Sequence, residues 1–169
     1  MEGPRRGKLP MHRIREFVST DSVAISKIAA AEPKIAQWSV DAYAQVLSNG
    51  YLCWVAEDTD ERKVVGFIVV RLIAPEAEIL NLAVDRENRE QGVATSLLEV
   101  VLANLRERNT ERLHLEVRPS NTAAISFYQK HLFTLSGVRP NYYSEPAEAA
   151  LLMARAISEF PQAAGTSLT

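Results

Sequence analysis

The sequence predicts one mixed α/β domain in which helices cover both faces of a central, mostly antiparallel sheet. Three apolar or β-branched runs follow one another between residues 51 and 85 with only short polar turns between them, as in consecutive antiparallel strands. Stretches before and after these runs carry apolar residues at helical spacing. A length of 169 residues and a hydrophobic content of 47% suit a single domain with a sizeable core.

The N-terminal part is predicted to form a strand followed by a helix. Residues 11–19 form the first expected strand. Either Asp21 or Ser22 can cap the helix that follows, and it continues to about Ala31 because Pro33 cannot extend it.

A second helix is expected after the N-cap residue Ser39. The pair Asn49–Gly50 stops it. Its apolar positions at helical spacing are Ala42, Tyr43, Val46 and Leu47.

The middle of the chain contains three strands and the strongest helix. Residues 51–57 and 64–73 form a hairpin across the charged turn 58–63, and residues 77–85 form a third strand. Residues 91–108 form an amphipathic helix with Ala94, Leu97, Leu98, Val101, Leu102 and Leu105 on one face.

The C-terminal part is predicted to add three more strands and a helix to the domain. Residues 113–117 are a strand, and Ser120 or Asn121 caps a helix through about His131. Two further strands, 133–143 and 149–157, close the sheet. We therefore expect a domain over residues 10–157, with flexible flanks at 1–9 and 158–169.

Composition and net charge limit the classes of binding partner that we expect. The formal net charge is only −2 with both signs interspersed, which argues against nucleic acid or an anionic membrane as a direct partner. No apolar run is long enough to span a bilayer, and the first residues do not resemble a secretory signal. The one cysteine, Cys53, lies in an apolar strand and excludes an internal disulfide. We expect a cytoplasmic protein that is a monomer or weak dimer, with Cys53 as a small core residue.

The most informative segment is a strand that runs into a glycine-bearing turn and then a helix. Leu80–Asp85 is the strand end, and Arg89–Thr95 contains the turn with Gly92. Backbone N–H groups at a helix N-terminus have no intrahelical partners and favour an anion. The spacing is neither the dinucleotide-binding fingerprint nor the P-loop. The segment predicts a phosphate-binding cradle, although a purely structural glycine is the alternative.

This segment resembles the acyl-CoA loop of the GNAT N-acetyltransferases, Q/R-x-x-G-x-G/A, with Arg89, Gly92 and Ala94 at its defined positions. Leu115–Tyr128 is similar to the L-E-V-R-x-S-N-x-x-A-x-x-x-Y block of the ribosomal-protein-alanine (RimI-like) branch of that family. Arg139–Tyr143 matches its R-x-N-Y-Y segment, and Trp38–Ser39 its W-S pair. The sequence departs from the family at Leu132, where glycine is usual.

The resemblance implies the GNAT fold, acetyl-CoA as co-substrate and no metal. The backbone of Leu82–Val84 pairs with the pantetheine amides in this family, unless a neighbouring strand occupies it here. The three histidines, His12, His114 and His131, show no metal-ligand spacing. The expected cofactor-binding residues are Leu82, Ala83, Val84, Arg89, Glu90, Gln91, Gly92, Val93, Ala94, Thr95, Asn121 and Tyr128.

Two residues are the catalytic candidates. Glu116, on a central strand, is the candidate base acting through a water, and a salt-bridged structural carboxylate is the alternative. His114 shares its face by period 2 and is expected to orient or pack. By resemblance, Tyr128 protonates the leaving CoA thiolate, and an ordinary core tyrosine is the alternative. Asn121 is either only an N-cap or also a contact to the pantetheine arm.

For the acceptor, the resemblance implies an N-terminal alanine of a ribosomal protein, acetylated directly in a ternary complex. Two alternatives remain open at this point: a GNAT enzyme acting on a lysine side chain or a small-molecule amine, and a weakly catalytic CoA-binding module. The substrate-binding residues implied for the peptide groove are Trp38, Asn81, Glu116, Asn141, Tyr142 and Tyr143.

Overall fold

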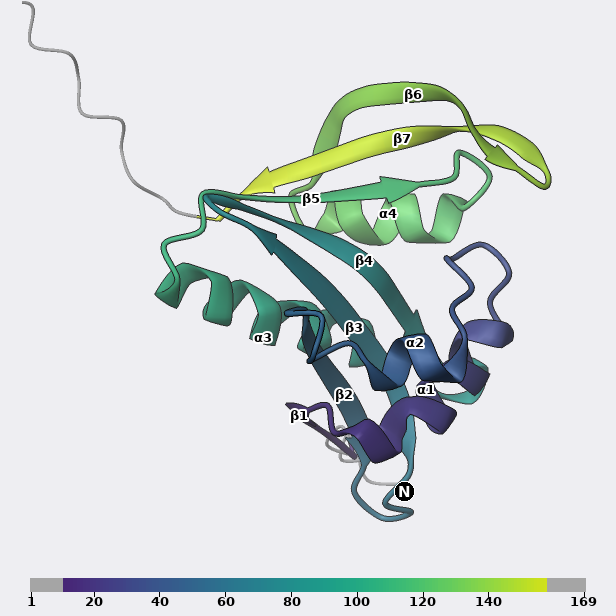
Figure 1. Ribbon diagram of the computed structural model, residues 1–169, viewed down its shortest axis with the longest axis vertical. Helices are drawn as coiled ribbons and strands as arrows, with labels where there is room; N and C mark the ends of the chain where they lie inside the picture. Colours follow the sequence, from purple (N-terminus) through teal and green to yellow (C-terminus); the bar gives the residue numbers. More distant parts are fainter. Residues whose placement is uncertain (1–10, 158–169) are drawn as a thin grey trace, which may run out of the picture.

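A computed structural model describes residues 11–157 of the chain, so the flanks expected at 1–9 and 158–169 lie outside the described residues. The described residues form a seven-stranded sheet in the order β1-β2-β3-β4-β5-β7-β6 (Figure 1). Only β4 and β5 are parallel neighbours. The strands are β1 (His12–Glu16), β2 (Leu52–Asp58), β3 (Val64–Ile73), β4 (Glu76–Val84), β5 (Arg112–Val117), β6 (Thr134–Ser144) and β7 (Ala147–Ala156). The helices are α1 (Ser22–Ala30), α2 (Val40–Ala44), α3 (Val93–Glu107) and α4 (Thr122–Lys130), with 3-10 turns at Ser19–Asp21 and Arg86–Asn88.

Helices cover both faces of this sheet, so the predicted mixed α/β architecture is confirmed (Figure 1). Alternate residues of the central strands point to opposite faces. Trp54 and Ile68 pack into the larger core, which holds the apolar faces of α3 and α4. Val55 and Phe67 pack into the second core, against α1 and α2. None of the helices within residues 11–157 has both the length and the apolar character needed to span a membrane.

The two parallel strands separate part-way along their length. β4 and β5 pair only from Glu76–Ile79 to Arg112–Leu115. Immediately after Ile79, the register of β4 against β3 shifts, and Leu80 is the extra residue. Such a bulge bends its strand. β4 then runs on to Val84 without β5 beside it, and the sheet opens into a wedge (Figure 1).

Two local predictions are wrong. α2 ends at Ala44 and is followed by turns, so it is much shorter than the expected helix to Asn49. The turns bury Val46 completely and leave Leu47 half exposed as the chain bends back towards β2. Asp21, one of the two predicted caps, is the N-cap residue of α1, but its side chain makes no capping hydrogen bond, because its carboxylate accepts hydrogen bonds from Arg15 and from the N–H of Val18 instead.

The unusual Leu132 adopts the left-handed conformation that normally favours glycine, with φ of 67°. The N–H of Leu132 bonds to the carbonyl of Gln129 at 3.1 Å, and the N–H of Phe133 bonds to that of Tyr128 at 3.0 Å. This is the pattern of a Schellman helix end. The Leu132 side chain is 71% exposed, so the turn is kept without a steric clash in the core.

Candidate active site

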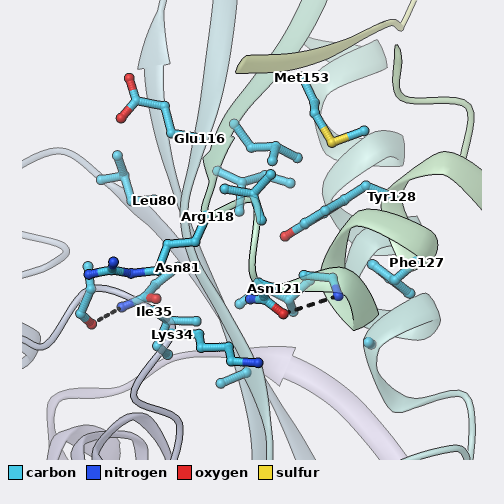
Figure 2. A pocket seen from close by; sticks show the side chains of 18 of the residues that line it. Lys34, Ile35, Leu80, Asn81, Glu116, Arg118, Asn121, Phe127, Tyr128 and Met153 are labelled. Atoms are coloured by element: carbon cyan, nitrogen blue, oxygen red, sulfur yellow. Dashed lines mark hydrogen bonds between the residues drawn. The ribbon is translucent and has the colours of Figure 1, made fainter. Parts of the chain in front are cut away.

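The wedge between β4 and β5 is a cleft of about 1300 Å³. It is bounded by the α1–α2 loop, the first turn of α3, helix α4 and the β6–β7 hairpin (Figure 2). All of the residues predicted for the site line it except Gln91 and Asn141. The Gln91 side chain instead donates to the carbonyl of Glu87 at 3.0 Å. Asn141 is exposed with φ of 54°, so it shapes the backbone of β6 rather than facing the cleft.

The start of α3 has the geometry of an anion cradle. Gly92 is its N-cap residue, with φ of 81°. The first helical hydrogen bond runs from the N–H of Ser96 to the carbonyl of Gly92 at 3.0 Å. The N–H groups of Val93, Ala94 and Thr95 therefore have no helical partner and stand at the positive end of a 15-residue helix. A Cβ at Gly92 would meet no atom within 4 Å, so here the backbone conformation rather than protein crowding requires glycine.

Arg89 ties this cradle to the rest of the cleft. Its Nε donates to the carbonyl of Val84 at 3.1 Å. Its Nη2 lies 3.1 Å from the carboxylate of Glu32, which follows α1. The guanidinium thus connects the cradle to the α1–α2 loop across the cleft.

Glu116 lies on β5 at the edge of the opening, on the α1 and α2 face of the sheet. Its neighbours Leu115 and Val117 point into the core on the α3 and α4 face, so Glu116 points the other way. The carboxylate is 3.0 Å from Nη1 of Arg139, and its side chain is 15% exposed. A hydrogen bond to this carboxylate raises the pKa of Tyr142 to about 12. His114 lies on the same strand, but its Nε2 is 2.8 Å from the Glu76 carboxylate rather than at Glu116.

Tyr128 comes from α4 on the opposite face. Its ring is 7% exposed and packs edge-on against Phe127 and Phe133, with ring centroids 5.2 Å away in each case. The hydroxyl end is turned into the cleft (Figure 2). Burial raises the pKa of Tyr128, so the phenol keeps its proton at neutral pH. Asn121 caps α4 as predicted, with its Oδ1 accepting from the N–H of Ala124 at 3.3 Å.

Sequence reasoning missed the role of Arg118, which holds the β6–β7 hairpin against the cleft. Its Nη1 donates to the carbonyl of Pro146 at 3.0 Å and to Oε2 of Glu148 at 3.1 Å. Its guanidinium also lies 4.0 Å from the centre of the Tyr143 ring. Arg118 and Arg139 both belong to the segments that carry the family resemblance, but no local pattern shows that one holds the hairpin and the other pairs with Glu116.

The profile of the GNAT acetyltransferase family matches residues 13–133. The chain belongs to this family. The [ribosomal protein bS18]-alanine N-acetyltransferase of Escherichia coli is 34% identical over 153 residues, which span 88% of this chain and 99% of that enzyme.

Solved GNAT structures show the same fold. The ribosomal-protein-S18-alanine N-acetyltransferase from Escherichia coli has a TM-score of 0.79 at 30% identity and covers 91% of this chain and 99% of its own. Ard1 from Thermoplasma volcanium also has a TM-score of 0.79, at 32% identity, and covers 88% of this chain and 99% of its own. This GNAT protein is therefore an N-acetyltransferase.

Residues 11–157 contain no group of three or more His, Cys, Asp or Glu side chains that could hold a metal ion. Cys53 is buried, and burial raises the pKa of its thiol. The thiol is therefore a core group, as its apolar strand predicts.

Proposed function

We propose that this chain is an acetyl-CoA-dependent N-terminal protein acetyltransferase that modifies the N-terminal alanine of a ribosomal protein. The observation that carries the proposal is the placement of Glu116 and Tyr128. They reach one opening in the sheet from opposite faces. A proton acceptor on one face and a proton donor on the other suit direct transfer between two molecules bound together. The name of the 34% identical relative supports the choice of acceptor.

The cofactor side of the cleft fits acetyl-CoA, which supplies the acetyl thioester. The unpaired N–H groups of Val93–Thr95 and the open conformation of Gly92 suit the diphosphate. The edge of β4 at Leu82–Val84 has no β5 neighbour, so its backbone can pair with the pantetheine amides as an added strand would. Arg89, Glu90 and Asn121 line the same channel, while Gln91 contributes only backbone to the loop.

The acceptor side is the face that carries Glu116. Trp38, Asn81, Tyr142 and Tyr143 surround it from three different elements. An α-amine has a pKa of about 7.7–8.0 against about 10.4 for a lysine side chain, so a larger fraction of it is already neutral near neutral pH. We assign these residues to an N-terminal peptide segment.

The proposed reaction needs two proton transfers. The amine reacts in its neutral form: its nitrogen lone pair attacks the thioester carbonyl carbon, and Glu116 takes one proton from that nitrogen, directly or through a water. The new C–N bond forms as the C–S bond breaks. Tyr128 gives its proton to the departing sulfur, and its buried, protonated phenol is suited to that role. No acyl-enzyme forms, which agrees with the burial of Cys53.

The test is thiol release from acetyl-CoA with three acceptors: an alanine-starting ribosomal peptide, its N-acetylated form with a lysine retained, and a polyamine. We expect turnover only with the free N-terminus. Turnover on the blocked peptide or the polyamine would move the function to side-chain or small-amine acetylation. No turnover with any of them would favour a CoA-binding module. A ribosomal acceptor would place the reaction in the cytoplasm.

A further inference from the structure

Asn81 carries a buried polar atom that the fold does not satisfy. The residue lies on β4, is 3% exposed and lines the cleft (Figure 2). Its amide nitrogen donates to the carbonyl of Ala36 at 3.0 Å and to the hydroxyl of Tyr43 at 2.9 Å. A carbonyl can only accept, so Ala36 determines which end of the amide is the nitrogen. The other end, Oδ1, is buried and accepts no hydrogen bond within residues 11–157.

A buried oxygen without a hydrogen-bond partner, such as Oδ1 of Asn81, is unusual. Nearly all buried polar groups in folded proteins have a hydrogen-bond partner, and a carbonyl oxygen without one is unfavourable. The amide is held from its nitrogen end by two elements on the α1 and α2 side, α2 and the loop before it. Because the residue lines the cleft, a molecule bound there is a possible source of a donor for this oxygen.

Asn81 and Glu116 stand on the two sides of the opening. The last paired residues of the parallel strands are Ile79 and Leu115, so Glu116 is one residue beyond the branch point and Asn81 two. Both point to the same face of the sheet, since Asn81 contacts Tyr43 of α2 and Glu116 points away from the α3 and α4 core. The strand pairing therefore places an amide and a carboxylate on the two strands that border the opening, on the same face of the sheet.

We propose that Oδ1 of Asn81 accepts a hydrogen bond from the acceptor amine and so selects primary amines. This inference rests on the proposed transferase reaction but not on the identity of the acceptor. A neutral primary amine has two N–H bonds. One proton is lost to Glu116, and the other stays on nitrogen and becomes the N–H of the product amide. Asn81 holds the N–H that survives, which leaves the lone pair directed at the thioester carbon.

A secondary amine cannot make both contacts. An N-methylated N-terminus has a single N–H in its neutral form, and the reaction removes that proton. Asn81 is then left without a donor throughout the transfer. Sites built to bond a substrate N–H discriminate strongly against analogues that lack it, because the buried protein group remains unpaired.

The experiment compares an alanine-starting peptide with its N-methylalanine counterpart in wild type and Asn81→Leu. Leucine has nearly the shape of asparagine, so steric exclusion of the methyl group is retained while the oxygen is removed. We expect wild type to prefer the primary amine by about 100-fold or more in kcat/KM, and Asn81→Leu to reduce the preference to within about 3-fold. Tyr43→Phe is the matched control, because it removes one partner of the amide nitrogen and leaves Oδ1 in place. It should keep the wild-type preference.

A wild-type preference that persists in Asn81→Leu would overturn the proposal, as would an equal loss in Tyr43→Phe. If Asn81→Leu does not fold, as judged by circular dichroism, Asn81→Asp replaces it. That variant keeps an oxygen and should keep a preference above about 10-fold, and loss of the preference would contradict the assignment. If wild type acetylates a polyamine or lysine instead of the peptide, the proposed function fails. The same ratio is then measured on that amine and its N-methyl derivative, so Asn81 is still tested.

Discussion

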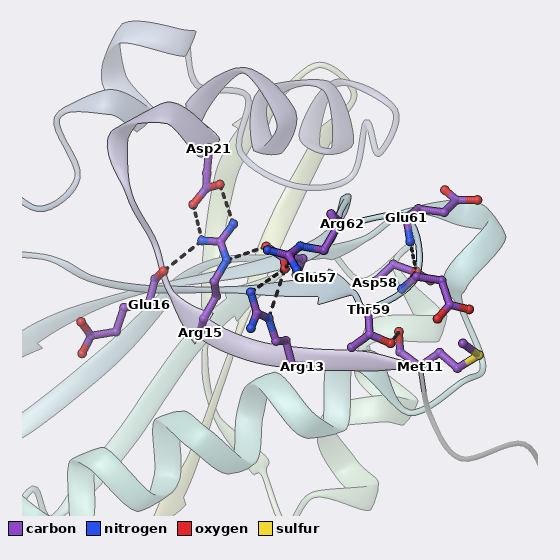
Figure 3. Close-up of polar contacts among 11 residues, drawn as sticks. Met11, Arg13, Arg15, Glu16, Asp21, Glu57, Asp58, Thr59, Glu61 and Arg62 are labelled. Carbon is purple, nitrogen blue, oxygen red and sulfur yellow. Dashed lines mark hydrogen bonds and ion pairs between the residues drawn. The ribbon is translucent and has the colours of Figure 1, made fainter.

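Glu57 on β2 and Glu116 on β5 are both largely buried glutamates on strands, yet their surroundings differ. Glu57 has a side chain that is only 7% exposed and lies among Arg13, Arg15 and Arg62 (Figure 3). Glu116 has one arginine partner, Arg139, whose side chain is 57% exposed. Arginines surround the Glu57 carboxylate, whereas the Glu116 carboxylate lies beside a cleft with an exposed arginine and the Tyr142 hydroxyl as partners.

The arrangement at Glu57 locks three segments together. Its Oε1 accepts from Nε and Nη2 of Arg13 at 3.1 and 2.8 Å, and its Oε2 accepts from Nε of Arg15 at 2.8 Å. Arg15 also bonds both carboxylate oxygens of Asp21, at 2.8 and 2.9 Å. Hydrogen bonds from Arg15 hold the pKa of Glu57 below its usual value. Three of the roughly four acceptor sites of this carboxylate are used by arginine N–H groups, so its role is structural.

The comparison shows that burial alone does not mark a functional carboxylate. The number of arginine partners and the access to a cleft distinguish the two glutamates. Substitutions at the two sites should therefore have different effects on catalysis and on stability.

Replacing Glu116 should damage catalysis and spare the fold. Glu116→Gln keeps the shape but removes the proton acceptor, so kcat/KM should fall by about 10²–10⁴-fold, the usual contribution of a general base. The melting temperature should stay close to wild type. Steady-state kinetics and thermal unfolding check both parts. A variant with normal kcat/KM would make Glu116 a second structural glutamate.

Tyr128 extends the comparison to the opposite face of the sheet. Tyr128→Phe keeps the ring packing against Phe127 and Phe133 but removes the proton donor. We expect kcat to fall by about 10²-fold or more while acetyl-CoA still binds with near wild-type affinity. Titration calorimetry with CoA and single-turnover kinetics separate the two quantities. Unchanged turnover would remove Tyr128 from the mechanism.

Replacing Glu57 should show the reverse pattern. Glu57→Gln removes the charge that three arginines surround, so the melting temperature should drop while kcat/KM stays within about 2-fold of wild type. The pKa of Glu57 is lowered in the folded state, so its stabilisation is present above the unfolded value of about 4.3 and is lost as the pH falls below it. Wild type should therefore lose more stability between pH 5 and 3 than Glu57→Gln, on urea unfolding at each pH. Equal pH dependence in both proteins would contradict the role assigned to Glu57.

Replacing Arg139 should have the smallest effect on activity and stability. Its ion pair with Glu116 is solvent-exposed on the arginine side, and exposed pairs contribute about 1 kcal/mol or less. Arg139→Gln should change kcat/KM by less than about 5-fold and leave the melting temperature unchanged. Arg15→Gln is the matched variant beside Glu57 and should lower the melting temperature clearly. If both substitutions destabilise equally, the two glutamates do not differ as described.

Local sequence signals placed most of the elements. The run from Val64 to Ile73 has the predicted bounds, and α3 lies within the predicted helix 91–108. Caps at Ser39 and Asn121 form as expected because each depends on a side chain and a backbone N–H three residues away. The helix after Ser39 was predicted too long, since its end depends on how the chain must return to β2.

Local periodicity and turn chemistry predicted the strand-glycine-helix cradle, the face that Glu116 and His114 share on β5 and the position of Tyr128 on α4. Which carboxylate is available for catalysis depends on the tertiary structure. Glu57 and Glu116 both interrupt apolar strands. The three arginines that form ion pairs with Glu57 come from β1 and the β2–β3 turn. The separation of β4 and β5 after Ile79, which opens the cleft beside Asn81, also depends on strand pairing across distant segments. Strand pairing and ion pairs of this kind join residues far apart in the chain, so no local pattern in one sequence reveals them.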